Sequence, residues 1–220
     1  MSRERPMSVD SASGDDLSGL AGEIADTYED FADVDRLDDW STWAMVATMV
    51  PLLAGLSMLQ MVSGGVLETY EGVLLENPSL LILVPVQIGT AGNLGSIMCS
   101  RLSTQLHLGT FEFKLSNPDI QANSLAVVGL AGTVFTLVGI AAWVIGQALG
   151  GRLTFLEVFT VSIVSGMILA VIVVVVSLVA VTTSYRLGYN PDDTTIPLVT
   201  NICDITGVIV LFLVVTVVVL

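Results

Sequence analysis

The chain of 220 residues is 53% hydrophobic and 13% charged, yet it carries a formal net charge of -14. An ordinary soluble domain is about 25% charged, so a chain this apolar is expected to keep its charges apart from a membrane-embedded region. The acidic balance excludes nucleic acid as a partner because no basic patch is available for phosphates, and two cysteines in apolar runs exclude a disulfide scaffold.

The acidic charge is concentrated at the start of the chain. Residues 1–39 hold 12 acidic residues against three arginines and contain no apolar run typical of a signal peptide. Apolar residues recur at helical spacing over about 17–36, which predicts one amphipathic helix. We expect an acidic cytoplasmic tail, whose helix either docks on the membrane domain or is a solvated helix covering its own protein.

The rest of the chain, 40–220, contains five apolar stretches long enough to cross a bilayer. A helix needs about 20 largely apolar residues to cross a bilayer, and each stretch is at least that long; valine-rich lone strands are disfavoured because they leave backbone groups unsatisfied in lipid. The fold class expected is an all-α integral membrane protein with five transmembrane helices. The stretches are 43–67, 79–100, 120–151, 158–185 and 194–220.

An Asn-Pro pair precedes three of these stretches, at Asn77, Asn117 and Asn190. Asparagine favours the N-cap position and proline is tolerated in the first helical turn, so helices are expected to begin there. The alternative is that the pairs only mark loops, which places the helix starts nearby as well.

Basic residues indicate the orientation. With the N-terminus inside, six of the seven basic residues are cytoplasmic and only Arg152 is external. This distribution follows the positive-inside rule and predicts a multi-pass protein of the cell membrane with a cytoplasmic N-terminus.

Asp204 is the only ionisable carboxylate well inside a predicted span. A charge at the bilayer centre costs about 3 kcal/mol on insertion scales, so it is expected to face an ion path or a partner. No basic residue in any span is placed to pair with it, which favours a cation from solution; the alternative is a protonated Asp hydrogen-bonded between helices. Asn201 and Thr200 share its helical face, Pro197 can free a backbone carbonyl, and Gly207 permits close approach.

A second candidate segment lies in the span over 79–100. Glycines at 89, 92 and 95 form one stripe free of side chains, which indicates either helix packing or a backbone-lined aqueous path. Neighbouring polar residues favour the path. The pore-lining candidates here are Gly89, Gly92, Asn93 and Ser96.

Oxygen ligands without histidine or thiolate favour a hard cation, and Mg²⁺ retains several waters when few carboxylates hold it. One Asp204 per chain is few ligands for a divalent ion, whereas a two-fold dimer places two copies around one axis. The sequence shows no P-loop or zinc-protease motif, and the single histidine, His107, is isolated. We therefore expect no enzymatic activity.

These residues resemble a known family. The segments Leu83-Val-Pro-Val-Gln-Ile-Gly-Thr-Ala-Gly-Asn93, Ser100-Arg-Leu-Ser-Thr104 and Asp204-Ile-Thr, with Pro197 before the last, look like the membrane domain of MgtE-type magnesium channels. They look still more like one repeat of the animal magnesium transporters of solute-carrier family 41. The resemblance implies five helices per unit, a pore between two units lined around Gly92 and Asn93, and Asp204 as the central cation-binding carboxylate.

Two differences from that family are visible. Bacterial relatives carry large magnesium-sensing domains, where this chain has only the short tail, and a polar Asn often stands before the proline of the last span, where this chain has Ile196. We expect transport of Mg²⁺, hydrated or partly so, through a homodimer or a heterodimer with a similar half-length chain. The alternative function is a non-conducting or regulatory membrane subunit. Channel or Na⁺-coupled exchange, transport direction, and Ca²⁺ or Mn²⁺ competition stay open.

Overall fold

The computed structural model describes residues 42–108, 117–187 and 191–220. The acidic tail and its expected helix over about 17–36 lie outside this part of the chain. By internal contacts the chain divides into two units, 1–50 and 51–220, and the second contains the rest of helix α2 (Thr42–Thr69) and all the later helices.

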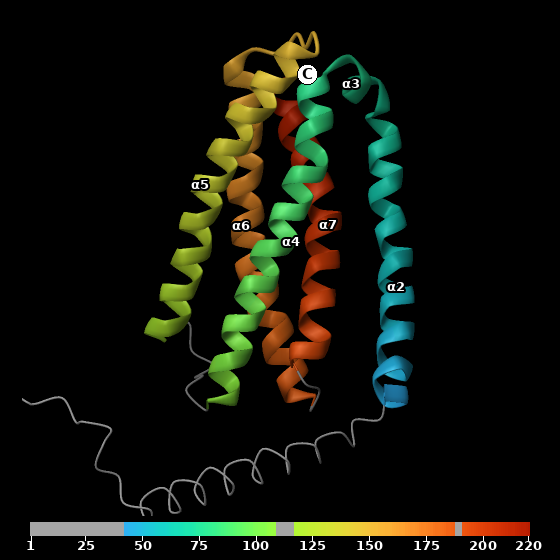
Figure 1. Ribbon diagram of the computed structural model, residues 1–220, viewed down its shortest axis with the longest axis vertical. Helices are drawn as coiled ribbons and strands as arrows, with labels where there is room; N and C mark the ends of the chain where they lie inside the picture. Colours follow the sequence, from blue (N-terminus) through green and yellow to red (C-terminus); the bar gives the residue numbers. More distant parts are fainter. Residues whose placement is uncertain (1–41, 109–116, 188–190) are drawn as a thin grey trace, which may run out of the picture. The chain divides into compact units, whose positions relative to one another are not determined.

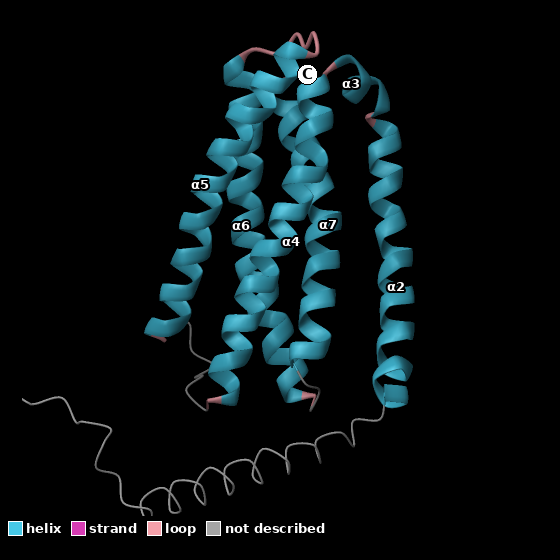
Figure 2. Cartoon of the chain, viewed as in Figure 1, coloured by secondary structure: helices cyan, strands magenta, loops and turns pink. Residues whose placement is uncertain are grey.

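The described residues form five long helices and one short one, with no strand among them (Figures 1 and 2). Each long helix contains a segment apolar enough to cross a membrane, as the sequence predicted. All five long helices begin before the corresponding apolar run, whereas α5 and α7 end two to three residues before theirs. They are α2 (Thr42–Thr69), α3 (Glu71–Glu76), α4 (Pro78–His107), α5 (Pro118–Ala148), α6 (Phe155–Arg186) and α7 (Pro191–Val218).

The helix starts follow the Asn-Pro pairs. Asn117 is the N-cap of α5, and its side chain accepts a hydrogen bond from the Asp119 backbone N–H at 2.9 Å. Asn77 is also an N-cap, of α4, but its amide instead donates to the carbonyl of Val73 at 2.9 Å. This asparagine therefore joins the end of α3 to the start of α4.

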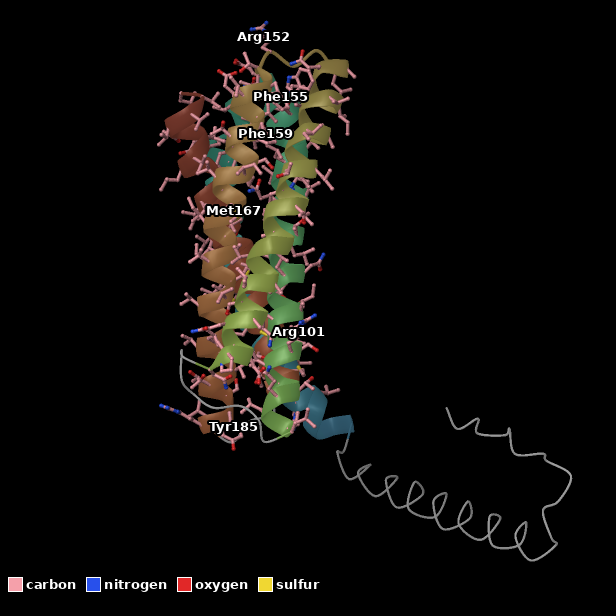
Figure 3. All side chains as sticks on the ribbon, turned by 90° about the vertical axis from the view of Figure 1, so that its left-hand side faces the viewer. Arg101, Arg152, Phe155, Phe159, Met167 and Tyr185 are labelled. Atoms are coloured by element: carbon pink, nitrogen blue, oxygen red, sulfur yellow. The ribbon has the colours of Figure 1, made fainter. Side chains whose placement is uncertain are left out.

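Four helices pack into one bundle. Contacts join α4, α6 and α7 to one another and α5 to both α4 and α6. The short α3, the connection between α5 and α6, and the end of α7 lie together at one end of the bundle (Figure 1). Arg152 lies at that end, and Tyr185 lies at the other (Figure 3).

Glycines let the bundle helices approach closely. A Cβ atom on Gly139 of α5 would lie 3.0 Å from the Cβ of Ser162 of α6, and one on Gly166 of α6 would overlap the ring of Phe135. Phe135 is fully buried, so its ring fills the space that Gly166 leaves. Small residues at helix contacts are typical of membrane proteins, where dispersion contacts replace the hydrophobic effect.

Candidate cation site

Asp204 lies close to the midpoint of α7 and is partly buried. Its Oδ2 atom accepts a hydrogen bond from Nε2 of Gln60 in α2, at 2.6 Å. Neither α2 nor α7 contains a basic residue, and α4 has its two, Arg101 and His107, only in its last turns. The surrounding helices thus provide an amide for this carboxylate and no cationic partner at its depth.

The backbone of α4 passes directly beside the carboxylate. A Cβ on Gly92, near the midpoint of α4, would lie 3.8 Å from Oδ1 of Asp204 and 3.1 Å from Cγ2 of Thr200. A Cβ on Gly95 would lie 2.7 Å from Cγ1 of Val199. Two glycines of the stripe therefore pack α4 against α7, and this packing brings the α4 backbone to Asp204.

The polar neighbours of Asp204 on α7 are hydrogen-bonded to their own helix. The Asn201 amide donates to the carbonyl of Pro197 at 2.9 Å, and the Thr200 hydroxyl donates to the carbonyl of Ile196 at 2.8 Å. In these hydrogen bonds both side chains act as donors. The amide oxygen of Asn201 and the hydroxyl oxygen of Thr200 are therefore available as acceptors for a cation or for its bound water. Ile196 and Pro197 are themselves partly buried.

The remaining candidates occupy different surfaces. Gly89 and Asn93 are exposed on α4, and a Cβ on Gly89 would meet nothing within 4 Å. Ser96 is partly buried, and its hydroxyl donates to the carbonyl of Gly92 at 3.1 Å. Gly207 is buried against Ile88 of α4. The structure thus brings Asp204, Thr200 and Gly92 together, and leaves Gly89 and Asn93 on an open face.

Another polar residue of the same segment lies away from this site. Gln87 is fully buried and donates hydrogen bonds to Ser165 and to the carbonyl of Ser162, both in α6. It belongs to the interior of the bundle, so the polar residues of α4 serve two separate surfaces.

Gln60 is the neighbour of Asp204 that the sequence analysis missed. It is the only side-chain amide in α2, and this is the signal that could have singled it out. The pairing itself joins residues 144 positions apart, and no local pattern indicates such a contact.

The site contains one acidic group. Among the described residues no group of three or more His, Cys, Asp or Glu side chains is placed to hold a metal. A fully dehydrated divalent cation needs about six oxygen ligands. The arrangement therefore suits a cation that keeps much of its water.

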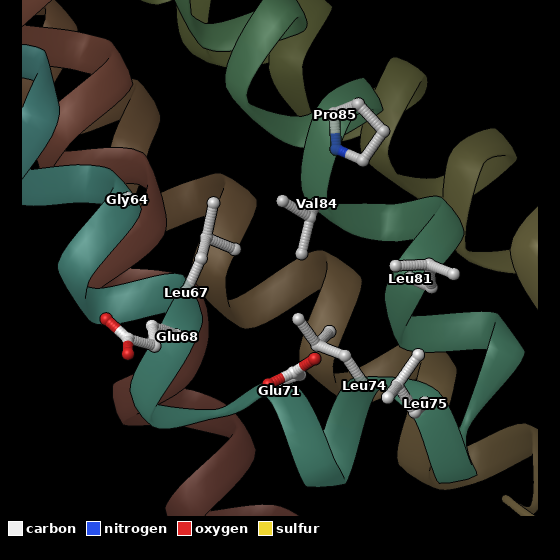
Figure 4. A pocket seen from close by; sticks show the side chains of 9 residues that line it. All are labelled: Gly64, Leu67, Glu68, Glu71, Leu74, Leu75, Leu81, Val84 and Pro85. Atoms are coloured by element: carbon white, nitrogen blue, oxygen red, sulfur yellow. The ribbon is translucent and has the colours of Figure 1, made fainter.

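A cavity of about 750 Å³ lies between α2, α3 and α4. Its lining includes Gly64, one turn beyond Gln60 in α2, and Pro85, two turns before Gly92 in α4. Leu67 and Val84 face each other across it, and Glu68 and Glu71 come from the α2–α3 side (Figure 4). The cavity is thus displaced from the Asp204 site toward the α3 end.

Comparison with known proteins gives the family. The MgtE model, described as a divalent cation transporter, matches residues 84–214, which is more than half of the chain and includes both Gly92 and Asp204. The chain belongs to the MgtE family. This MgtE-family chain is a multi-pass membrane protein, and the family consists of membrane transporters rather than enzymes.

Curated relatives agree with this placement. Solute carrier family 41 member 3 of Rattus norvegicus is 29% identical over 179 residues, which cover 79% of this chain and 38% of the rat protein. Solute carrier family 41 member 2 of Gallus gallus is 26% identical over 136 residues, covering 60% of this chain and 24% of the chicken protein. The MgtE-family chain therefore spans well under half the length of the relatives it matches.

Proposed function

We propose that this chain transports Mg²⁺ across the cell membrane through a pore formed between two chains, with Asp204 as the cation site. The observation that carries this proposal is a carboxylate at the midpoint of α7 with Gln60 as its hydrogen-bond donor and no basic residue at its depth. Such a charge is costly in the membrane unless a counter-charge reaches it. A cation in transit supplies that counter-charge.

The ligand chemistry supports Mg²⁺ as the transported ion. Asp204, Asn201 and Thr200 offer only oxygen atoms, which hard cations prefer. Mg²⁺ dehydrates reluctantly and is commonly held through one or two carboxylates with several waters retained. One carboxylate from each of two chains fits that preference.

An exposed polar face on α4 supports the pairing of two chains. Asn93 lies at the depth of Asp204, and polar Ser100 and Thr104 continue this exposed face along α4, together with Gly89 and the apolar Ile97. An amide in contact with lipid is unfavourable, whereas one that faces a second chain or a water-filled pore is satisfied. The second chain is a copy of this one or a similar half-length chain.

The charges at the two ends of the bundle support the orientation. Arg152 lies at the α3 end and Arg101 toward the opposite end (Figure 3). The helix ends place Arg186 with Arg101, and they place the acidic residues of the α2–α3 segment with Arg152: Glu68, Glu71 and Glu76. The positive-inside rule then makes the α3 end external. The N-terminal residues 1–39 become an acidic cytoplasmic tail and 40–220 the transmembrane domain.

Substitution of the proposed cation ligand tests this function. Asp204→Asn keeps the shape and a hydrogen-bonding oxygen but removes the charge, so Mg²⁺ uptake into proteoliposomes should fall at least tenfold. Asp119→Asn, in the first turn of α5, is the matched control and should transport normally. Unchanged uptake by Asp204→Asn would exclude the intramembrane site.

The same uptake assay distinguishes a transporter from the alternative, a non-conducting or regulatory membrane subunit. A purified wild-type chain that conducts nothing alone, but alters flux through a separate transporter, would favour a regulatory membrane subunit. Uptake that needs an opposing Na⁺ gradient would identify an exchanger rather than a channel.

A further inference from the structure

We propose that Gln60 is a tethered competitor for the cation: its amide occupies Asp204 in the empty site and must leave Oδ2 before the cation binds that oxygen. This inference rests on the proposed function of Asp204 and adds a residue that sets the affinity and release of the ion. It starts from the 2.6 Å hydrogen bond between Nε2 and Oδ2.

The orientation of Gln60 within α2 is the first argument. Its neighbours Met58, Leu59 and Met61 are 73%, 55% and 76% exposed, as expected for a helix that faces lipid. Gln60 is partly buried and turned toward α7. An amide in hydrocarbon is costly unless it is hydrogen-bonded, so Asp204 fixes the direction of this face of α2.

Contacts on both sides of Gln60 hold α2 in place when its side chain leaves Asp204: Leu56 is 5% exposed, and Val66 packs against the core. The Tyr70 ring, just beyond α2, stacks on Phe212 of α7 at 4.3 Å between ring centres, and its hydroxyl is 3.2 Å from that of Thr216. Ten residues of helix separate Gln60 from Tyr70, about 15 Å. Gly64 and Gly65 lie between them, and a Cβ on either would meet nothing within 4 Å. The Tyr70 contact therefore holds the end of α2 when the Gln60 contact opens.

Amide chemistry makes Gln60 suited to alternate between two states. An N–H group stabilises an ionised carboxylate that has no cation, but a cation at Oδ2 repels the same N–H. The amide is neutral, so it satisfies Asp204 without cancelling the charge that attracts the ion. A lysine at this place would cancel it. Once displaced, the amide can turn its Oε1 toward water bound to the cation.

Competition of this kind predicts the direction in which Mg²⁺ affinity changes when the Gln60 amide is removed. A cation that binds Oδ2 must first break the hydrogen bond from Gln60 to that oxygen, and hydrogen bonds to charged groups are worth more than neutral ones. Removal of the amide should therefore tighten binding and slow release. A residue that only supported the structure would produce weaker binding or none.

The test uses Gln60→Met, which keeps the length and flexibility of the side chain but donates no hydrogen bond. The Mg²⁺ concentration for half-maximal uptake into proteoliposomes should fall about tenfold, equivalent to about 1.4 kcal/mol. The maximal rate should fall with it. The matched control is Gln147→Met, which removes a glutamine hydrogen bond to the carbonyl of Leu153 and should leave half-saturation unchanged.

Direct Mg²⁺ binding to the full chain in nanodiscs provides a second readout that does not depend on transport. Gln60→Asn, one methylene shorter, should reproduce the tighter binding if Gln60→Met fails to fold. The inference that Gln60 competes with the cation would be overturned if the Mg²⁺ concentration for half-maximal uptake and the binding affinity stayed within twofold of wild type, or if binding became weaker. If Asp204→Asn abolishes uptake in the same preparation while Gln60→Met changes nothing, only this inference fails; if Asp204→Asn transports normally, the proposed function fails first.

Discussion

At the scale of single residues, the proposed cation site depends on the absence of a side chain at Gly92. The carboxylate of Asp204 and the methyl group of Thr200 occupy the space beside the α4 backbone that a side chain at Gly92 would need. Gly89, one turn earlier in α4, differs in this respect, since it is exposed and a Cβ there would meet nothing within 4 Å. A methyl group added at Gly92 would therefore contact the proposed site, whereas one added at Gly89 would not.

Gly92→Ala places a Cβ 3.1 Å from Cγ2 of Thr200 and 3.8 Å from Oδ1 of Asp204. Thr200 must give way by a few tenths of an ångström, which displaces a cation ligand by a similar distance. We expect Mg²⁺ uptake to fall severalfold while the folded protein is retained. Gly129→Ala, in α5 where a Cβ would meet nothing within 4 Å, is the control and should transport as wild type; an equal loss in both variants would contradict a role specific to Gly92.

At the scale of helices, the contact of α5 with α6 is made by Phe135 of one and Gly166 of the other. The ring is fully buried over the glycine, so it occupies the space that a side chain at position 166 would need. Interiors this closely packed resist added volume. The contact therefore predicts a stability effect rather than a transport effect.

Gly166→Ala should destabilise the protein by about 1–3 kcal/mol, because the new methyl group overlaps the Phe135 ring and forces the helices apart. Thermal unfolding in detergent is the measurement. Gly129→Ala, in α5 where a Cβ meets nothing within 4 Å, should leave the transition unchanged. A normal transition for Gly166→Ala would mean that the helices repack without cost.

The number and placement of the helices could be predicted from the sequence because each apolar run is as long as a bilayer is thick, and Asn-Pro pairs mark the starts. Which side of a helix faces inward could not. A helix that is apolar all round carries no moment to orient it, so Gln87 and Asn93 looked alike although one is buried against α6 and the other is exposed. Asp204 was recognisable by its charge alone; its partner Gln60 required the tertiary contact.

At the scale of the whole molecule, the proposed pairing of two chains uses the open face of α4. If two chains meet across Asn93, a cysteine there should cross-link them. Asn93→Cys should yield an oxidant-dependent dimer in membranes, whereas Val171→Cys, exposed on α6, should not. Cys99 and Cys203 are buried and do not interfere. Cross-linking only at Val171 would place the interface elsewhere.

The exposure of α2 also bears on the lipid around the protein. The apolar segment of α2, Met49–Thr69, has 21 residues and is about 32 Å long, which matches a hydrocarbon thickness of about 30 Å, so a thinner bilayer would require α2 to tilt. The other long helices are held in place by one another, but most described side chains of α2 are exposed. Bilayer thickness therefore acts on α2 first, through its tilt. Since Gln60 is part of this helix, we expect bilayer thickness to affect the contact between Gln60 and Asp204, and through it the proposed cation site.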